Sequence, residues 1–182
     1  MEWTDLAETI VRENGERASV MRTLHTIQAQ ALLRTDRLLF IPSLMCSIAS
    51  AAIQTTVVDS DGWRYTAAGL AVVAGTLAAA NKHLQLSEQS NMHRHVASAY
   101  ATAHGLATAE LALSRSERIC AKTLLTDMRQ SLDATTKIAP VIDRKIVTEF
   151  MRTFENQDDI ALPDICNEFK RILIRDDSDV LV

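Results

Sequence analysis

The sequence predicts an all-α fold: a two-helix transmembrane hairpin, a long cytosolic helix and shorter C-terminal helices. Apolar residues make up 47% of the chain but aromatic residues only 4%, a mixture that favours helix over sheet. The apolar residues concentrate between Leu38 and Ala80, and no proline interrupts residues 82–136. The 182 residues are therefore divided into N-terminal amphipathic helices (1–37), the hairpin (38–81) and a cytosolic helical region (82–182).

The N-terminal region is expected to form two amphipathic helices. The first, over residues 5–13, has Thr4 or Asp5 as its N-cap. Asn14–Gly15 predicts a break, and residues 16–37 resume a helical period. The acidic start and the late apolar block differ from a cleaved signal peptide, so none is expected.

Two runs without a charged side chain have the lengths expected of membrane-spanning helices. Residues 38–58 would extend about 30 Å, the thickness of the hydrocarbon layer, with Pro42 in the first turn. Residues 65–81 would extend about 25 Å and are rich in alanine, so we expect both runs to insert together across the polar turn 59–64. The alternative is a buried hairpin inside a soluble bundle, although core helices usually carry some charge over such a length.

Flanking charges predict the orientation of the hairpin. Arg34, Arg37 and Lys82 flank the two runs, whereas the turn carries Asp59 and Asp61. Because basic residues favour the cytosolic side, both termini are predicted to be cytosolic.

Aromatic and small residues predict how the hairpin is seated. Trp63 and Tyr65 are expected to form an interfacial belt. Small residues recur every four positions, which lets two helix backbones approach closely in lipid. The predicted packing residues are Ser43, Ser47, Ala51, Ala67, Ala71, Gly75 and Ala79.

The region after the hairpin is predicted to be one very long helix over residues 82–136, or two helices broken near Asn91 or Gly105. A stripe at spacings of three, four and seven predicts a packing seam, through which we expect self-association. The seam comprises Met92, Val96, Ala99, Ala103, Leu106, Leu113, Cys120 and Leu124. Pro140 and Pro163 are each expected to open a further helix.

No pattern in the sequence predicts catalysis, a cofactor or a metal site. No two histidines lie four apart with an acidic third ligand in register, so we expect ordinary histidines at His83, His93, His95 and His104. Cys46, Cys120 and Cys166 lie far apart, which fits a reducing compartment. The net charge of -4 without a basic patch argues against nucleic acid as a partner.

Three polar residues leave two possibilities open. Glu110 and Glu117 could line a pore or, as we expect, flank the seam and pair with Arg or Lys on a neighbouring helix. Gln54 could also line a pore, but a packing role between helices is expected.

Two segments after the second run carry a resemblance to a known family. Residues 88–118 contain Glu88, a histidine, Tyr100 and the Glu110–Leu111 pair, and they end in Arg115 and Arg118. The second segment contains Ala139 and the motif Pro140, Ile142, Ile146 and Phe150. With the helical layout, these segments resemble the two-transmembrane SLATT proteins over about residues 16–154.

The Pro-Ile-Phe ending resembles the versions encoded by large nucleocytoplasmic DNA viruses. This resemblance implies a structural protein of the internal virion membrane, a minor capsid protein that anchors the lipid layer to the capsid shell. Bacterial relatives imply an alternative, a pore-forming effector of antiviral defence, although the short second run argues against a conducting pore. A helper subunit of the membrane without its own activity is a third possibility. The expected partners are the lipid bilayer, capsid or other membrane-associated proteins, and further copies of the chain.

Overall fold

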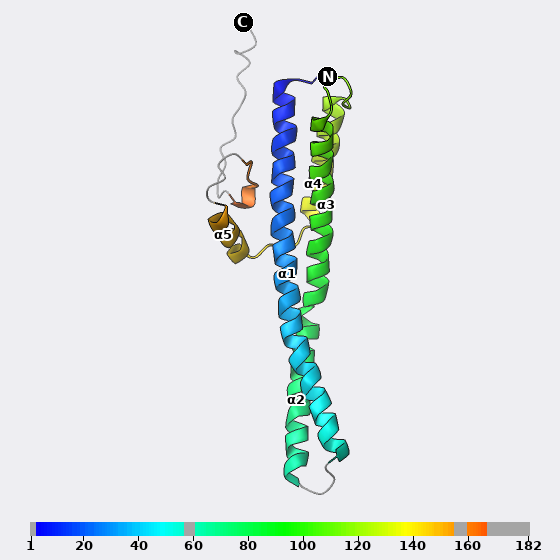
Figure 1. The fold of residues 1–182 in the computed structure, drawn as a ribbon, viewed down its shortest axis with the longest axis vertical. Coiled ribbons are helices and arrows are strands. Elements are labelled where there is room, and N and C mark those ends of the chain that lie inside the picture. The colour runs from blue at the N-terminus through cyan, green and yellow to red at the C-terminus, as the bar shows by residue number, and fades with distance from the viewer. Residues whose placement is uncertain (1–2, 57–60, 155–159, 167–182) are drawn as a thin grey trace.

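The computed structural model describes residues 3–56, 61–154 and 160–166. The described residues form α1 (Asp5–Thr56), α2 (Asp61–Leu84), α3 (Leu86–Ala112), α4 (Ala121–Ile138), α5 (Arg144–Thr153) and the 3-10 turn η1 (Asp164–Cys166). No strand occurs among them, which confirms the predicted all-α class. The molecule is elongated, with the α1–α2 hairpin at one end and the N-terminus at the other (Figure 1).

Helix α1 has 52 residues and is about 78 Å long. The Thr4 hydroxyl accepts the Ala7 N–H at 3.2 Å, so one of the two predicted N-caps is confirmed. The predicted break at Asn14–Gly15 is wrong, because α1 continues through both residues. Packing explains this glycine: a Cβ at Gly15 would lie 2.9 Å from the Cβ of Ala107, so its absence lets α1 and α3 approach closely.

The same helix also runs without interruption across residues 37 and 38. Pro42 therefore lies in the helix interior, not in a first turn. A proline there has no N–H to donate to the carbonyl of Leu38 and commonly bends a helix. Figure 1 shows the axis of α1 changing direction between its blue N-terminal half and its cyan C-terminal half.

Helices α2 and α3 together run back along α1. α2 packs beside the C-terminal half of α1 and α3 beside the N-terminal half (Figure 1). Against α3, and again against α2, facing positions rise by sevens along α1 and fall by sevens along the partner, which is the register of an antiparallel coiled coil. The two series are not continuous, because the step from His25 to Ser43 is not a multiple of seven. The facing pairs are Val11–Ala107, Ala18–Tyr100, His25–His93, Ser43–Ala74 and Ser50–Ala67.

The helix predicted over residues 82–136 is divided at Gln85 and again at residues 113–120. The predicted break points near Asn91 and Gly105 are wrong, because both residues lie inside α3. Gln85 has φ 49° and ψ 36°, the left-handed conformation that ends α2 and starts α3. Glycine or asparagine usually adopts this conformation, so the sequence carries no signal for this break.

Helices α4 and α5 complete a helical body that we call the stalk, together with α3 and the N-terminal half of α1. Leu124 and Met128 of α4 are buried against α1 and α3. Val147 and Phe150 of α5 are buried against α1 in a second cluster. The larger buried side chains therefore gather in the stalk, at a distance from the α1–α2 hairpin.

Pro140 does not open a helix as predicted. After Pro140 the chain stays extended until α5, whose N-cap is Asp143. The Asp143 carboxylate accepts the Lys145 N–H at 2.9 Å, and this capping fixes the helix start. Pro163 precedes η1, and the remainder of the predicted last helix lies outside the described residues.

Candidate functional site

Two serine hydroxyls bind the α1–α2 hairpin together. Ser43 donates to the carbonyl of Ala74 at 3.0 Å, and Ser50 donates to the carbonyl of Ala67 at 2.8 Å. All four residues are buried between the helices. Such hydrogen bonds need the two backbones to be close, and only small side chains at the interface permit this.

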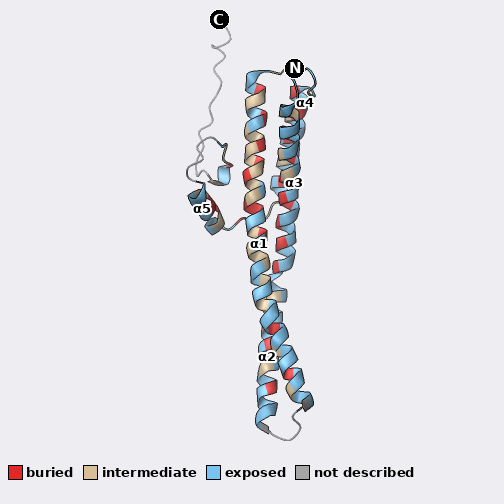
Figure 2. Ribbon diagram, in the orientation of Figure 1, coloured by how far each residue is buried: buried red, intermediate tan, exposed pale blue. Residues whose placement is uncertain are grey.

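The large apolar side chains of the hairpin point outward. Figure 2 shows that most of the hairpin is exposed, whereas buried residues line the α1–α3 contact of the stalk. The exposed apolar residues of the hairpin are Leu38, Phe40, Ile41, Leu44, Met45, Ile48, Val72 and Val73. Burial in the hairpin is therefore the reverse of that in a water-soluble protein, with small and polar residues inside and large apolar residues outside.

One described helix, α1, is long and apolar enough to cross a membrane by length and composition. Only 11% of its most apolar stretch is buried within the chain. α2 does not reach the same apolar content, since alanine and glycine occupy much of it. A helical hairpin is thus present, but the prediction that both its helices cross a membrane is not confirmed.

Only some of the predicted packing residues of the hairpin lie in the interface between α1 and α2. Ser43 and Ala67 lie in the interface, as do Ser50 and Ala74, which the four-residue stripe missed. Ser47, Ala51, Ala71 and Gly75 line a shallow open groove along the interface instead, and Ala79 is exposed. The signal that finds Ser50 and Ala74 is a seven-residue period, counted from Ser43 and Ala67.

Other polar and aromatic residues of the hairpin lie at its surface. Trp63 and Tyr65 are exposed in the first two turns of α2. Gln54 lies along the same groove as Ser47, and its amide donates to the Ser50 hydroxyl at 3.5 Å. The groove is therefore the polar side of a mostly apolar surface.

A pair of buried histidines joins α1 to α3 in the stalk. The Nδ1 atoms of His25 and His93 lie 2.8 Å apart, and the side chains are 0% and 2% exposed. The ring of His25 also stacks on that of Tyr100, with centroids 5.8 Å apart. Sequence reasoning missed His25, although it continues the seven-residue period of Val11 and Ala18.

The environment of the histidine pair favours neutral rings. Burial, and then the proximity of His93, lower the pKa of His25 from 6.5 to about 4. Burial also lowers the pKa of His93. Within the described residues, Nε2 of His25 has no hydrogen-bond partner.

A cavity of about 540 Å³ lies between α1, α3, α4 and the segment around Pro140. His25, Tyr100 and Arg17 contribute to its wall, together with Asp133 of α4 and Asp164 of η1. Apolar side chains form much of the remainder: Ala18, Met21, Leu132, Val141, Ile142 and Ile165. The family-like motif thus borders the histidine pair, because Pro140 and Ile142 line the same cavity.

The other members of the motif pack onto α1. Phe150 is buried against Val20 and Leu24, and Ile146 is half-buried beside them. The backbone N–H of Asp143 donates to the Gln28 side chain at 3.0 Å, which fixes the entry into α5. The motif therefore packs α5 and the segment before it against α1 within the stalk.

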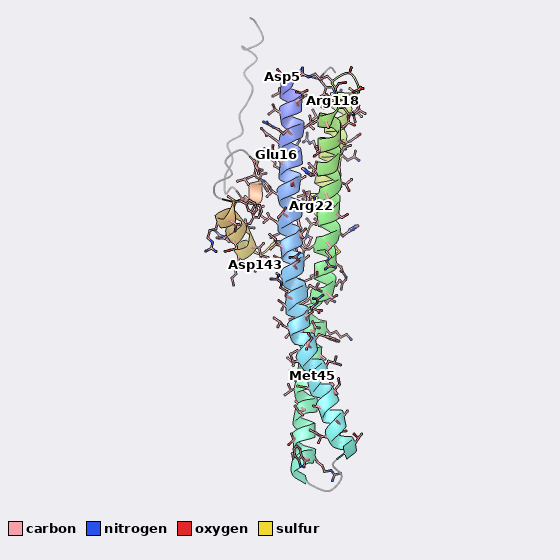
Figure 3. All side chains as sticks on the ribbon, viewed as in Figure 1. Asp5, Glu16, Arg22, Met45, Arg118 and Asp143 are labelled. Carbon is pink, nitrogen blue, oxygen red and sulfur yellow. The ribbon has the colours of Figure 1, made fainter. Side chains whose placement is uncertain are left out.

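An ion cluster closes the end of the stalk opposite the hairpin. Arg115 and Arg118 donate to Glu8 at 2.7 and 2.6 Å, and Arg115 also pairs with Asp5. The two guanidinium groups, Arg115 first, lower the pKa of Glu8 from 4.5 to about 2. Figure 3 shows Asp5 and Arg118 at this end, far from Met45 in the hairpin.

The glutamates expected to flank the seam stabilise the loop between α3 and α4. Glu117 accepts the hydroxyl and N–H of Ser114, and Glu110 accepts the N–H of Ile119. Their predicted pairing with Arg or Lys is not found among the described residues, where both carboxylates accept hydrogen bonds from the loop itself.

The predicted seam is divided between contacts within the chain and the surface. Val96, Ala103 and Leu124 are buried in the stalk. Met92, Leu106, Leu113 and Cys120 are exposed. Over residues 3–56, 61–154 and 160–166, no group of three or more His, Cys, Asp or Glu could hold a metal ion.

Searches of protein-family models, of curated proteins and of solved structures found no match to the chain. The resemblance to the SLATT proteins accordingly stays a prediction.

Proposed function

We propose that the chain is a two-pass integral membrane protein with a structural role, in which the α1–α2 hairpin anchors the rigid stalk to a bilayer. The observation that carries this proposal is the reversal of burial along α1. Before residue 38 the helix buries large side chains such as Val11 and Leu24. Beyond it, the helix buries Ser43 and Ser50 and exposes Phe40 and other large apolar groups.

Lipid is the environment that accounts for this reversal. Exposed apolar side chains are unfavourable in water but well solvated by acyl chains. Lipid supplies no hydrophobic drive between helices, so small residues and hydroxyl-to-carbonyl hydrogen bonds have to hold them together. Ser43 and Ser50 provide these bonds at two levels of the hairpin, seven residues apart.

The positions of the charged and aromatic residues support both termini on the cytosolic side. Arg34 and Arg37 precede the apolar part of α1, and Lys82 lies in the last turn of α2. Trp63 and Tyr65 are exposed at the opposite end, where an interfacial belt would contact the other leaflet. In this orientation the stalk is cytosolic.

The structural role that fits this form is a connection between a bilayer and a protein shell. The part of α1 before residue 38 would extend about 50 Å from the membrane. In a virus that assembles in the cytoplasm, the cytosolic face of its membrane faces the capsid. We therefore propose a protein of the internal virion membrane, a minor capsid protein that anchors this membrane to the capsid shell.

Contacts within the chain limit the surfaces on which a shell protein could dock. Ile146 packs onto α1, so the face around it is not available to a partner. The seam expected to drive self-association is partly used within the chain, because Val96 and Ala103 are buried. Capsid proteins and further copies of the chain stay proposed partners.

Protease protection tests the membrane topology. Tags at both ends of the chain should be digested from the cytosolic side of sealed membranes, while a tag inserted after Asp61 should be protected. Alkaline carbonate should leave the chain in the membrane fraction. A protected N- or C-terminal tag would contradict the topology, and release by carbonate would contradict membrane integration.

Purified particles test the structural role. The chain should co-purify with intact virions of its native source at a fixed ratio to a major shell protein. Recovery from cell membranes alone would contradict the capsid-anchoring role, while leaving the membrane topology unaffected.

A pore-forming effector is the second candidate, because one observation favours it. The groove along the hairpin is lined by Ser47, Ser50 and Gln54 and has a volume of about 340 Å³. Several copies arranged with these grooves inward would surround a polar path. Planar-bilayer recordings of the purified chain should then show conductance that Gln54→Leu reduces. The absence of conductance would exclude this candidate.

A further inference from the structure

The contact between His25 and His93 restricts which of their ring nitrogens can carry a proton. Two N–H groups cannot face each other across the 2.8 Å between the Nδ1 atoms. In the neutral pair one Nδ1 therefore carries a proton and donates a hydrogen bond, and the other Nδ1 accepts that hydrogen bond. The chain must hold the two rings in complementary tautomers.

Added protons disturb this arrangement in two steps. The first enters at the bare Nε2 of the donor ring and creates an imidazolium at a site that is 0 to 2% exposed. The second protonates the accepting Nδ1 and places two N–H groups face to face. The rings then have to separate, and α1 and α3 with them.

The surroundings provide little to offset an added charge. The ionisable groups that face His25 are His93 and Tyr100 from α3 and, around the shared cavity, Arg17 of α1, Asp133 of α4 and Asp164 of η1. Tyr100 is neutral and Arg17 is cationic. Neither aspartate hydrogen-bonds to His25, because its Nε2 has no partner among the described residues.

We propose that the His25–His93 pair is an acid-sensitive contact, so that proton uptake separates α1 from α3 and opens the middle of the stalk. The pair is well placed for this role, because His25 lines a cavity whose wall also includes the segment around Pro140. The lowered pKa of His25, about 4 against 6.5, has the matching sign. The proposal does not depend on the membrane topology.

Hydrogen exchange of the full chain in detergent micelles tests the proposal. Protection factors corrected for intrinsic rates should fall by about thirtyfold between pH 7.5 and pH 5.0 in peptides covering residues 18–29 and 90–100. The double substitution His25→Leu and His93→Leu should abolish this fall. His104→Gln is the matched control, because His104 also lies between α1 and α3 but donates to the Gly15 carbonyl, and it should retain the fall.

If the double variant does not fold, a pH titration of the histidines in the natural chain still tests the proposal. Histidine ring resonances followed by NMR should show that His25 stays neutral until pH 5 or below and that His93 titrates below the ordinary pKa of histidine. Titration of His25 at the ordinary pKa of 6.5 would overturn the proposal. An unchanged pH dependence in a folded double variant would also overturn it.

Discussion

The backbone of Gly15 on α1 lies directly against Ala107 on α3, so closely that a Cβ at Gly15 would be 2.9 Å from the Cβ of Ala107. Two further contacts surround this point: Val11 packs with Ala107, and His104 donates from Nδ1 to the Gly15 carbonyl at 3.0 Å. The distance between α1 and α3 is therefore set by a residue without a side chain.

Gly15→Ala should destabilise the stalk even though alanine is the better helix former. The overpacked methyl group should cost about 1–3 kcal/mol, more than the gain of up to about 1 kcal/mol in helix propensity. Thermal unfolding followed by circular dichroism measures the difference. Gly105→Ala is the matched control, because open space surrounds Gly105 in α3, and it should be neutral or stabilising.

Ser50→Ala should weaken the hairpin by about 0.5–1.5 kcal/mol, because it removes the 2.8 Å hydrogen bond to the Ala67 carbonyl. Ser43→Ala should have a similar effect through Ala74. Unfolding in detergent micelles measures both changes. Ser47→Ala is the control, since Ser47 is exposed on the groove, and a loss as large as that of Ser50→Ala would contradict the interface described here.

The ion cluster around Glu8 predicts a loss of stability in strong acid. The pKa of Glu8 is lowered in the folded chain, from 4.5 to about 2. Its contribution is therefore complete above pH 4.5 and is lost as the pH falls towards 2. This window lies below that of His25, whose contribution is complete above pH 6.5 and is lost as the pH falls towards 4.

Glu8→Gln should reduce the loss of stability between pH 4.5 and 2 and leave the change between pH 6.5 and 4.5 intact. Unfolding midpoints measured at closely spaced pH values separate the two windows. Glu149→Gln is the matched control, because the Arg152–Glu149 pair on α5 is exposed, and it should change neither window. If the unfolding midpoint changed in a single pH transition that Glu8→Gln removed completely, two separate titrations would be contradicted.

The sequence predicted the parts of the fold that depend on local patterns. The helical class, the cap at Thr4 and the uncharged apolar stretch of α1 follow from composition, capping and hydropathy. The breaks were not predictable, because Gly15 serves close packing instead of a turn and Gln85 adopts a conformation unusual for its type.

The candidate sites depend on which residues face one another across α1 and its partners. A four-residue stripe found Ser43 and Ala67 but missed Ser50, since the true contacts recur every seven residues. His25 and His93 are 68 positions apart, so no local spacing brings them together. The antiparallel register of α1 against α2 and α3 would have identified both the serine contacts and the histidine pair.

The membrane anchor is the central claim, and the depth of Met45 in the bilayer tests it most directly. Met45→Trp, in a chain in which Trp3 and Trp63 are replaced by phenylalanine, should be strongly quenched by lipids brominated on their acyl chains. Met92→Trp is the control on α3, where Met92 is also exposed, and it should not be quenched. Equal, weak quenching at both positions would contradict the anchor and identify the hairpin as part of a water-exposed assembly.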